Sequence, residues 1–219
     1  MSNQYDAIII GSGQGGTPLA TTLGKAGWKT ALIERDHIGG TCINYGCTPT
    51  KTLVASAEVA YMARRAMEYG IKLGNVSVDM SSVRERKRAM VKKWREGSEK
   101  RLAEAKLVAL VHGEGSFVGA KTVRVRLNDG GERTLTADLV VINTGLRANV
   151  PQITGLASVP YLDNASVMEL DEVPERLLVL GGGYVGLEFA QMFRRFGSQV
   201  TVIQSGKQLL TNEIGRAHV

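Results

Sequence analysis

The sequence predicts an α/β fold with two dinucleotide-binding units in series, and three observations lead to this prediction. First, segments 11–16 and 181–186 both read G-x-G-x-x-G, and each directly follows an apolar, β-branched run. Second, each segment is followed by a helical pattern and a short strand pattern, in the same register of 23 positions. Third, from Leu107 the hydrophobic period changes to two, which is typical of antiparallel strands inserted as a β-meander.

The first unit has the sequence features of a Rossmann-like βαβ unit. Gly11 makes the tight turn, Gly13 lets the backbone approach a pyrophosphate, and Gly16 lets the helix pack closely on the strand. The N-terminus of that helix favours negatively charged phosphates. Glu34 follows the second strand and is placed to accept hydrogen bonds from ribose hydroxyls. The expected elements are a strand over 5–10, a helix that ends near 24–27 and a strand over 30–33.

The second unit repeats this arrangement with one important change. Where the first unit has Glu34, the second has the neutral Gln204. An acid at this position favours NAD because it repels a 2′-phosphate, so its absence, with Lys207 close by, favours NADPH over NADH. A solvated loop lysine is the alternative interpretation of Lys207. The loop glycines are Gly181, Gly183 and Gly186, and the expected elements are a strand over 177–180, a helix to about 196 and a strand over 200–203.

Two helices and several short strands are expected between these units. The first helix is predicted over 50–69, and the second is predicted to run to about 106 with Ser81 as its N-cap. Trp94 belongs to an apolar stripe on the second helix and is predicted to lie in the core. The strands are predicted over 108–111, 122–127, 133–137 and 138–142, with turns at 113–115 and 128–131.

Both cysteines of the chain, Cys42 and Cys47, lie in the glycine-flanked segment 39–51. Two buried structural cysteines are one interpretation. A zinc site is disfavoured because it needs four ligands and no further Cys or His lies nearby, so no metal site is expected. A redox couple is the third interpretation, because the first turn of the helix that follows would favour a thiolate at Cys47.

The segment GGTCINYGCTPTK resembles the redox-active segment of the FAD-dependent pyridine nucleotide–disulfide oxidoreductases, and the resemblance extends from about residue 5 to residue 204. It implies that Cys47 lies beside the flavin and that Cys42 meets the substrate. It also implies that Lys51 lies near the flavin N5 and forms a partly buried ion pair with Glu188. Further implied cofactor contacts are Gly40, Thr41, Thr144 and Gly145 for FAD and Tyr184 for the nicotinamide.

The activity implied by this resemblance is the passage of electrons from NAD(P)H through FAD to a Cys42–Cys47 disulfide, and on to a small-molecule or metal-ion substrate. The ending Thr-Pro-Thr-Lys and the segment Asn-Thr-Gly favour a mercuric reductase-like enzyme, and a dihydrolipoamide dehydrogenase-like enzyme is the alternative. Asn143 and Leu146 replace the residues usual in the family beside Thr144. An alternative of another class is an inactive FAD-binding fragment that lacks the dimer domain.

The resemblance also implies a domain organisation. We expect a FAD-binding domain with the cysteine pair over 1–150, and the N-terminal part of an NAD(P)-binding domain over 151–212. Residues 213–219 match no family segment and read as the translation of a common sequencing adapter, so we predict a non-native tail on a truncated chain. The full-length parent is expected to be a homodimer in which the partner supplies a His–Glu acid–base pair.

Composition gives further expectations about partners. The net charge of +6 equals the excess in segment 84–106, which holds ten Lys or Arg and four Glu. This pattern indicates the solvated face of one helix rather than a nucleic-acid site. No apolar run reaches membrane-spanning length, and the N-terminus does not read as a signal peptide. We therefore expect a cytoplasmic protein without nucleic-acid or membrane partners.

Overall fold

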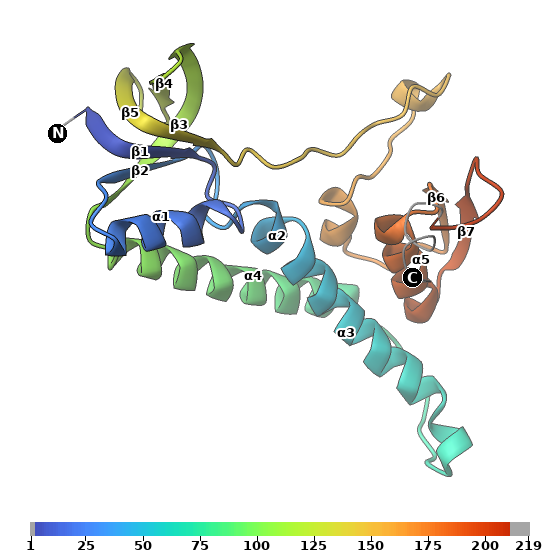
Figure 1. Ribbon diagram of the computed structural model, residues 1–219. Helices are drawn as coiled ribbons and strands as arrows, with labels where there is room; N and C mark the ends of the chain where they lie inside the picture. Colours follow the sequence, from blue (N-terminus) through green and yellow to red (C-terminus); the bar gives the residue numbers. More distant parts are fainter. Residues whose placement is uncertain (1–2, 211–219) are drawn as a thin grey trace, which may run out of the picture. The chain divides into compact units, whose positions relative to one another are not determined.

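The computed structural model describes residues 3–210, and the chain divides into two compact units (Figure 1). The first unit comprises Met1–Thr48 and Met90–Gln152, and the second comprises Pro49–Ala89 and Ile153–Val219. The division at 152 lies close to the boundary predicted at 150, but segment 49–89 groups with the second unit. The domain assignment over 1–150 and 151–212 stays a prediction, and the proposed tail over 213–219 lies outside the described residues.

Five strands of the first unit pair in a closed ring (Figure 1). Four of them form parallel pairs in the order β5–β1–β2–β3, and β4 pairs antiparallel with both β3 and β5. The first two strands confirm the strand predictions around the first glycine-rich segment. The bounds are β1 (Gln4–Ile10), β2 (Thr30–Glu34), β3 (Val108–Gly119), β4 (Thr122–Leu127) and β5 (Glu132–Ile142).

Two predictions about the later strands are wrong. The turn predicted at 113–115 lies inside β3, because this long strand pairs with β2 in its first half and with β4 in its second. Gly113 is needed there for close approach rather than for a turn, since a Cβ would overlap the carbonyl oxygen of Arg126. The strands predicted over 133–137 and 138–142 are one continuous strand, β5, which likewise changes partner from β4 to β1.

Side chains of the first unit form two cores, because successive strand residues point to opposite faces. On one face, Ile9 and Leu32 pack with Ala20 of α1 (Gly16–Lys25) and with Leu102 of α4 (Met80–Ala103), whose residues 90–103 belong to this unit. On the other face, apolar side chains from all five strands pack together; among them are Ile8, Ile33, Val111, Val125 and Leu135. The edge of the sheet where β1 and β2 end is thereby fixed between two packed layers.

The helices after the first unit's parallel strands differ in detail from the prediction. A short helix, α2 (Gly40–Asn44), precedes α3 (Cys47–Arg64), and a separate 3-10 turn covers Ala66–Tyr69. The helix predicted over 50–69 is therefore two elements, the second of which ends at Gly70 with φ +76°. Ser81 is not the N-cap of α4: Asp79 accepts hydrogen bonds from the Ser82 backbone N–H (3.0 Å) and hydroxyl (2.7 Å).

The second unit contains a parallel βαβ arrangement made of β6 (Arg176–Leu180), α5 (Tyr184–Phe196) and β7 (Gln199–Ile203). These bounds agree with the strands and helix predicted around the second glycine-rich segment. Two 3-10 turns, Leu156–Ser158 and Ser166–Glu169, precede β6. The core joins α3 to α5 and to the second of these turns; among its members are Leu53, Ala57, Met168, Met192 and Phe193.

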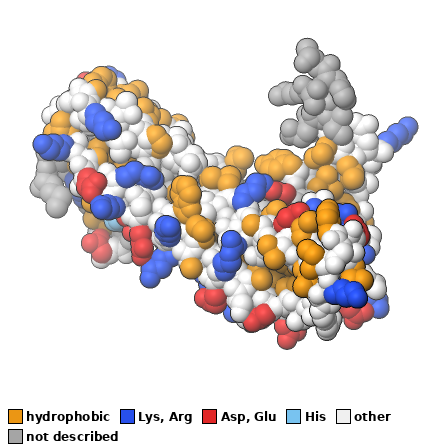
Figure 2. Space-filling view, turned by 90° about the horizontal axis from the view of Figure 1, so that it is seen from below, with side chains coloured by type: hydrophobic (Ala, Val, Ile, Leu, Met, Phe, Trp, Pro, Cys, Tyr) orange, Lys and Arg blue, Asp and Glu red, His pale blue; other side chains and the backbone are white. Residues whose placement is uncertain are grey.

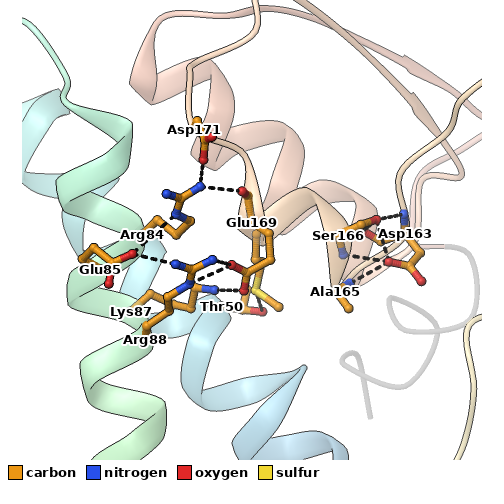
Figure 3. Close-up of polar contacts among 11 residues, drawn as sticks. Thr50, Arg84, Glu85, Lys87, Arg88, Asp163, Ala165, Ser166, Glu169 and Asp171 are labelled. Atoms are coloured by element: carbon orange, nitrogen blue, oxygen red, sulfur yellow. Dashed lines mark hydrogen bonds and ion pairs between the residues drawn. The ribbon is translucent and has the colours of Figure 1, made fainter.

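A polar cluster in the second unit surrounds Glu169 (Figure 3). The buried ammonium of Lys87 and the guanidinium of Arg88 both bind its carboxylate, the latter at 2.7 Å. Burial opposes ionisation of Glu169, but the hydrogen bonds from these two cations outweigh it and lower the pKa of the carboxyl. Because Lys87 would be costly to bury alone, this pairing explains how a lysine that is 3% exposed is tolerated.

The basic helix α4 carries acidic partners along its length. Ion pairs join Arg88 to Glu85 at 2.7 Å, Lys92 to Glu96 at 3.8 Å, and Lys100 to Glu104 at 3.9 Å. On the face shown in Figure 2, Lys and Arg side chains lie interspersed with Asp and Glu side chains. Within residues 3–210, no helix combines the length and the apolar character that crossing a membrane requires.

Candidate functional site

The first glycine-rich loop forms a cradle at the N-terminus of α1. Gly11 has φ +103°, a value that disfavours any other residue, and a Cβ on Gly16 would overlap the Gly11 carbonyl oxygen. Gly40 closes the loop from outside, since a Cβ there would lie 2.7 Å from the Gly13 Cα. The cradle brings backbone N–H groups and the positive end of a helix to one place, and it therefore fits the pyrophosphate of a dinucleotide such as FAD.

Glu34 is tied to this loop by Ser12. The Ser12 backbone N–H and hydroxyl both donate to Glu34 Oε2, at 2.9 and 2.6 Å, and the Asp36 N–H donates to Oε1 at 2.9 Å. The Ser12 hydroxyl oxygen also accepts the Gly39 N–H at 3.1 Å. A carboxylate accepts about four hydrogen bonds, so the 8% exposed Glu34 keeps capacity for one further donor such as a ribose hydroxyl.

The return strand β5 delivers residues 143–145 to the same loop. The Asn143 N–H donates to the Ile10 carbonyl at 2.8 Å, and its side-chain amide donates to the Gly11 carbonyl at 3.0 Å. Gly145 has φ +69°, and a Cβ on it would lie 4.0 Å from the Thr41 hydroxyl oxygen. The structure thus brings together the loop glycines, Gly40, Thr41 and the segment that holds Thr144.

The cysteine pair adjoins this assembly. Cys42 lies in α2, and Cys47 is the first residue of α3. Gly46 lies between them in close approach to α2, with a Cβ there only 3.1 Å from the Thr41 carbonyl oxygen. Both cysteines are free thiols. Burial, together with the neighbouring Cys47 thiol, raises the pKa of Cys42 from 9.0 to about 11. A free thiol at Cys42 is therefore protonated at neutral pH.

Cys42 opens into a cavity of about 450 Å³ within the first unit. Trp94 lines this cavity and is 51% exposed, so the prediction that it lies in the core is wrong. The error arises because the stripe is not buried evenly: Val91 and Leu102 are buried on either side, whereas α4 lines the cavity at Trp94. Among the described residues, the side chains that line it include one cation, Arg101, and no Asp, Glu or His. The remaining lining residues are Ser12, Gly13, Gln14, Thr17, Pro18, Thr21, Gly39, Ile43, Thr48 and Ser98.

The second glycine-rich loop repeats the geometry of the first. Gly181 has φ +105°, and a Cβ on Gly186 would overlap the Gly181 carbonyl oxygen. The Gln204 side-chain oxygen accepts the Gly182 N–H at 2.9 Å, which corresponds to the Ser12–Glu34 bond. Gly183 is the N-cap of α5, and Tyr184, its first residue, is 66% exposed.

The expected ion pair between Lys51 and Glu188 is present in the second unit, where α3 and α5 supply one partner each. The Lys51 side chain is 66% exposed and that of Glu188 is 30% exposed, so the partly buried member of the pair is the carboxylate. The pair therefore gains little stability from desolvated electrostatics, and its importance would lie in positioning.

Sequence reasoning missed three residues that support the site. Ser12 bridges the loop to Glu34, and Asn143 bonds the loop to β5. Asn44 anchors α2 by donating to the carbonyls of Ile38 (3.1 Å) and Gly40 (2.9 Å). Ser12 and Asn44 lie inside the two motifs and could have been singled out there, whereas the contact of Asn143 joins residues 132 positions apart.

Comparison with known proteins gives consistent matches along the chain. The sequence profile of the pyridine nucleotide-disulphide oxidoreductase family matches residues 5–218, so it does not separate the proposed tail from the rest. A mercuric reductase of Streptomyces lividans is 41% identical over 199 residues, which are 90% of this chain and 42% of that protein. A dihydrolipoyl dehydrogenase of Chlorobaculum parvum is 36% identical, over 97% of this chain and 45% of that protein.

The solved structures agree with these matches. The HOCl-induced flavoprotein disulfide reductase RclA from Escherichia coli superposes with a TM-score of 0.81 at 37% identity, covering 94% of this chain and 43% of that chain. Its Cu(II) complex gives a TM-score of 0.83, with 95% and 44% covered. The chain spans less than half the length of the relatives it matches. The chain belongs to the pyridine nucleotide-disulphide oxidoreductase family, whose members use FAD and NAD(P)H.

Proposed function

We propose that the whole protein is a flavoprotein disulfide oxidoreductase in which Cys42 and Cys47 form the redox pair. The observation that carries this proposal is the pair of free thiols beside the glycine cradle, with Cys47 at the start of a helix and Cys42 open to a cavity. In this proposal Cys47 is the thiol beside the flavin and Cys42 the thiol that meets substrate. The chemistry that bound FAD supplies is the transfer of two electrons between reduced nicotinamide and the cysteine pair.

The two loops divide the cofactors between them in this proposal. Gly11, Gly13 and Gly16 hold the ADP part of FAD, with Glu34 on its ribose. Gly40, Thr41, Thr144 and Gly145 support the rest of FAD from the segments that meet the first loop. The second loop binds the nicotinamide dinucleotide, and the neutral Gln204 supports NADPH over NADH. Its residues are Gly181, Gly183, Tyr184, Gly186 and Gln204, and Lys51 paired with Glu188 is proposed to lie near the flavin N5.

A base from outside the cavity is part of this proposal. A Cys42 thiol with a pKa of about 11 needs a proton acceptor before it can attack at neutral pH. The residues that line its cavity include no carboxylate and no imidazole. We propose that the whole protein is a homodimer whose partner subunit contributes this base, and that it works in the cytoplasm, where a catalytic disulfide is the usual kind.

The substrate we propose is a thiol-binding metal ion, as in mercuric reductase. Soft thiolate ligands suit such ions, and a mercuric reductase is among the relatives. The relative RclA, which is named as a disulfide reductase, has been solved as a Cu(II) complex. The alternative is a dihydrolipoamide dehydrogenase-like enzyme, which the match to dihydrolipoyl dehydrogenase supports.

The test is anaerobic reduction of the FAD-loaded chain by NADPH or NADH, followed by titration of accessible thiols and recording of the thiolate–flavin charge-transfer band. The unsubstituted protein should gain two thiols and show the band. Cys42→Ser should keep the band because Cys47 remains beside the flavin, and Cys47→Ser should lose it. A band that survives in Cys47→Ser would contradict the assigned roles. Flavin that is bound but never reduced by either nucleotide would support the rival, an inactive FAD-binding fragment.

A further inference from the structure

The carboxamide of Asn143 occupies the space beneath the first glycine-rich loop. Its Nδ2 donates to the Gly11 carbonyl at 3.0 Å. A Cβ on Gly15 would lie 2.9 Å from Asn143 Oδ1, and a Cβ on Gly16 would lie 2.8 Å from Nδ2. A Cβ on Gly13 would lie 3.3 Å from the same nitrogen. The loop therefore closes around one partly buried side chain, which borders the space left free by Gly13, Gly15 and Gly16 and holds Gly11 by a hydrogen bond.

The second loop has no equivalent among the described residues. A Cβ on Gly181 or on Gly183 would meet nothing within 4 Å, although the backbone of that loop has the same shape. Among the described residues, this support is specific to the first loop.

We propose that Asn143 is a positioning residue that pre-organises the first loop for the pyrophosphate of FAD, an inference that rests on the proposed assignment of this loop to FAD. The backbone N–H groups that face an anion bind it best when their directions are fixed beforehand. The hydrogen bond to Gly11 fixes the residue with positive φ, from which the rest of the loop follows. Asn143 itself stays beneath the loop and acts through the backbone.

Affinity for ADP and for FAD, measured by titration calorimetry on the apo chain, separates this role from others. Asn143→Ala should weaken both ligands by the same factor, about tenfold, because one hydrogen bond and its packing are lost. Asn143→Asp keeps the volume but replaces the donor with a carboxylate near the phosphates, so it should weaken both ligands at least as much. Ser158→Ala is the control, since the Ser158 hydroxyl also donates to a backbone carbonyl, that of Gly155 at 2.8 Å, but in the second unit.

Hydrogen exchange of amides 13–16 in the ligand-free chain is a second readout. It should accelerate in both Asn143 variants and stay unchanged in Ser158→Ala. Unchanged ADP affinity in the Asn143 variants would overturn the inference. Weaker FAD binding with unchanged ADP binding would overturn it too, because Asn143 would then affect the flavin part of FAD and not the pyrophosphate. An unsubstituted chain that binds neither ligand would overturn the assignment of the loop to FAD, and this inference with it.

Discussion

The two dinucleotide units of this chain have the same backbone but different surroundings. In the first, Ala7 pairs with Thr30 and Ile10 with Ile33; in the second, every partner is shifted by 170 positions, so that Leu177 pairs with Val200 and Leu180 with Ile203. The loop N–H to carbonyl bonds that follow, Gly11 to Ile33 and Gly181 to Ile203, are both 2.8 Å long. The local sequence pattern is therefore sufficient to specify the local geometry twice.

Burial separates the two units. Ile8, Ile10 and Ile33 are 0%, 8% and 1% exposed, whereas their counterparts Leu178, Leu180 and Ile203 are 58%, 45% and 51% exposed. The reason is the number of neighbours, because β1 lies between β2 and β5 and is covered by packed side chains on both faces, while within residues 3–210 β6 and β7 pair only with each other. Equal sequence patterns can therefore contribute unequally to stability.

The largest expected effect tests this contrast directly. Ile8→Ala should lower the free energy of unfolding by about 2–5 kcal/mol, because the side chain is fully buried and its removal leaves a cavity. Leu178→Ala, at the equivalent position, should change it by less than about 0.5 kcal/mol because that side chain is mostly in water. Both changes in the free energy of unfolding can be measured by urea unfolding, with hydrogen exchange as the probe. Equal losses would contradict the contrast in burial.

Both cysteines follow the first βαβ unit, so the two βαβ units also differ in thiol chemistry. The reactivity of Cys42 tests this difference. With a pKa of about 11 instead of 9.0, the folded Cys42 should hold about a hundredfold less thiolate at pH 8 than the unfolded chain. Its alkylation by iodoacetamide should rise with pH until about 11. The same shift favours the folded state below pH 9, and this contribution is lost as the pH rises to about 11.

Mass spectrometry that locates the label at Cys42 or Cys47 makes this measurement, with the urea-unfolded chain as the control. An alkylation rate at Cys42 that already levels off near pH 9 would show that burial does not govern its ionisation. The outcome also bears on the proposed function, because a readily ionised Cys42 would remove the need for a base from outside its cavity.

The next effect concerns the residue at which the two loops differ. Both carboxylate oxygens of Glu34 accept hydrogen bonds, so Glu34→Gln must turn an NH2 group toward a backbone N–H or the Ser12 hydroxyl. We expect a loss of about 1–3 kcal/mol in unfolding free energy. Glu114→Gln is the control; Glu114 is an exposed carboxylate on β3, and its variant should change stability by less than about 0.5 kcal/mol. Equal thermal shifts would rule out a structural role for Glu34 in the loop.

The sequence was sufficient for those parts of the fold that depend on local signals. Strands, turns and loop glycines of both βαβ units follow from periodicity and from the special backbone of residues such as Gly11 and Gly181. The pairing of β3 with two partners was missed, because Gly113 has the local signature of a turn and only the distant strand β4 explains it. Asp79 was missed as a cap because Ser81 is an equally good N-cap by residue type.

The site divides in the same way. Contacts inside one motif, such as the neighbouring cysteines, could be predicted from spacing and resemblance. Contacts made across the fold could not, since nothing local to Asn143 or Trp94 indicates that one supports a loop 132 positions away and the other lines a cavity. The exposure of Lys51 belongs to this second group, because burial depends on every element that surrounds a side chain.

The smallest expected effect restores the missing acid in the second loop. Gln204→Glu keeps an oxygen for the Gly182 N–H, now at 2.9 Å from Gln204 Oε1, and adds a negative charge where a 2′-phosphate would bind. The ratio of NADPH to NADH affinity should fall about tenfold, which corresponds to about 1.4 kcal/mol. Lys207→Ala tests the charge of the lysine separately from that of residue 204. If the lysine binds the phosphate, this variant should lower the affinity for NADPH and leave the affinity for NADH unchanged. If neither substitution changes the ratio, the second loop does not select its nucleotide by charge, and the likeness between the two loops is one of backbone only.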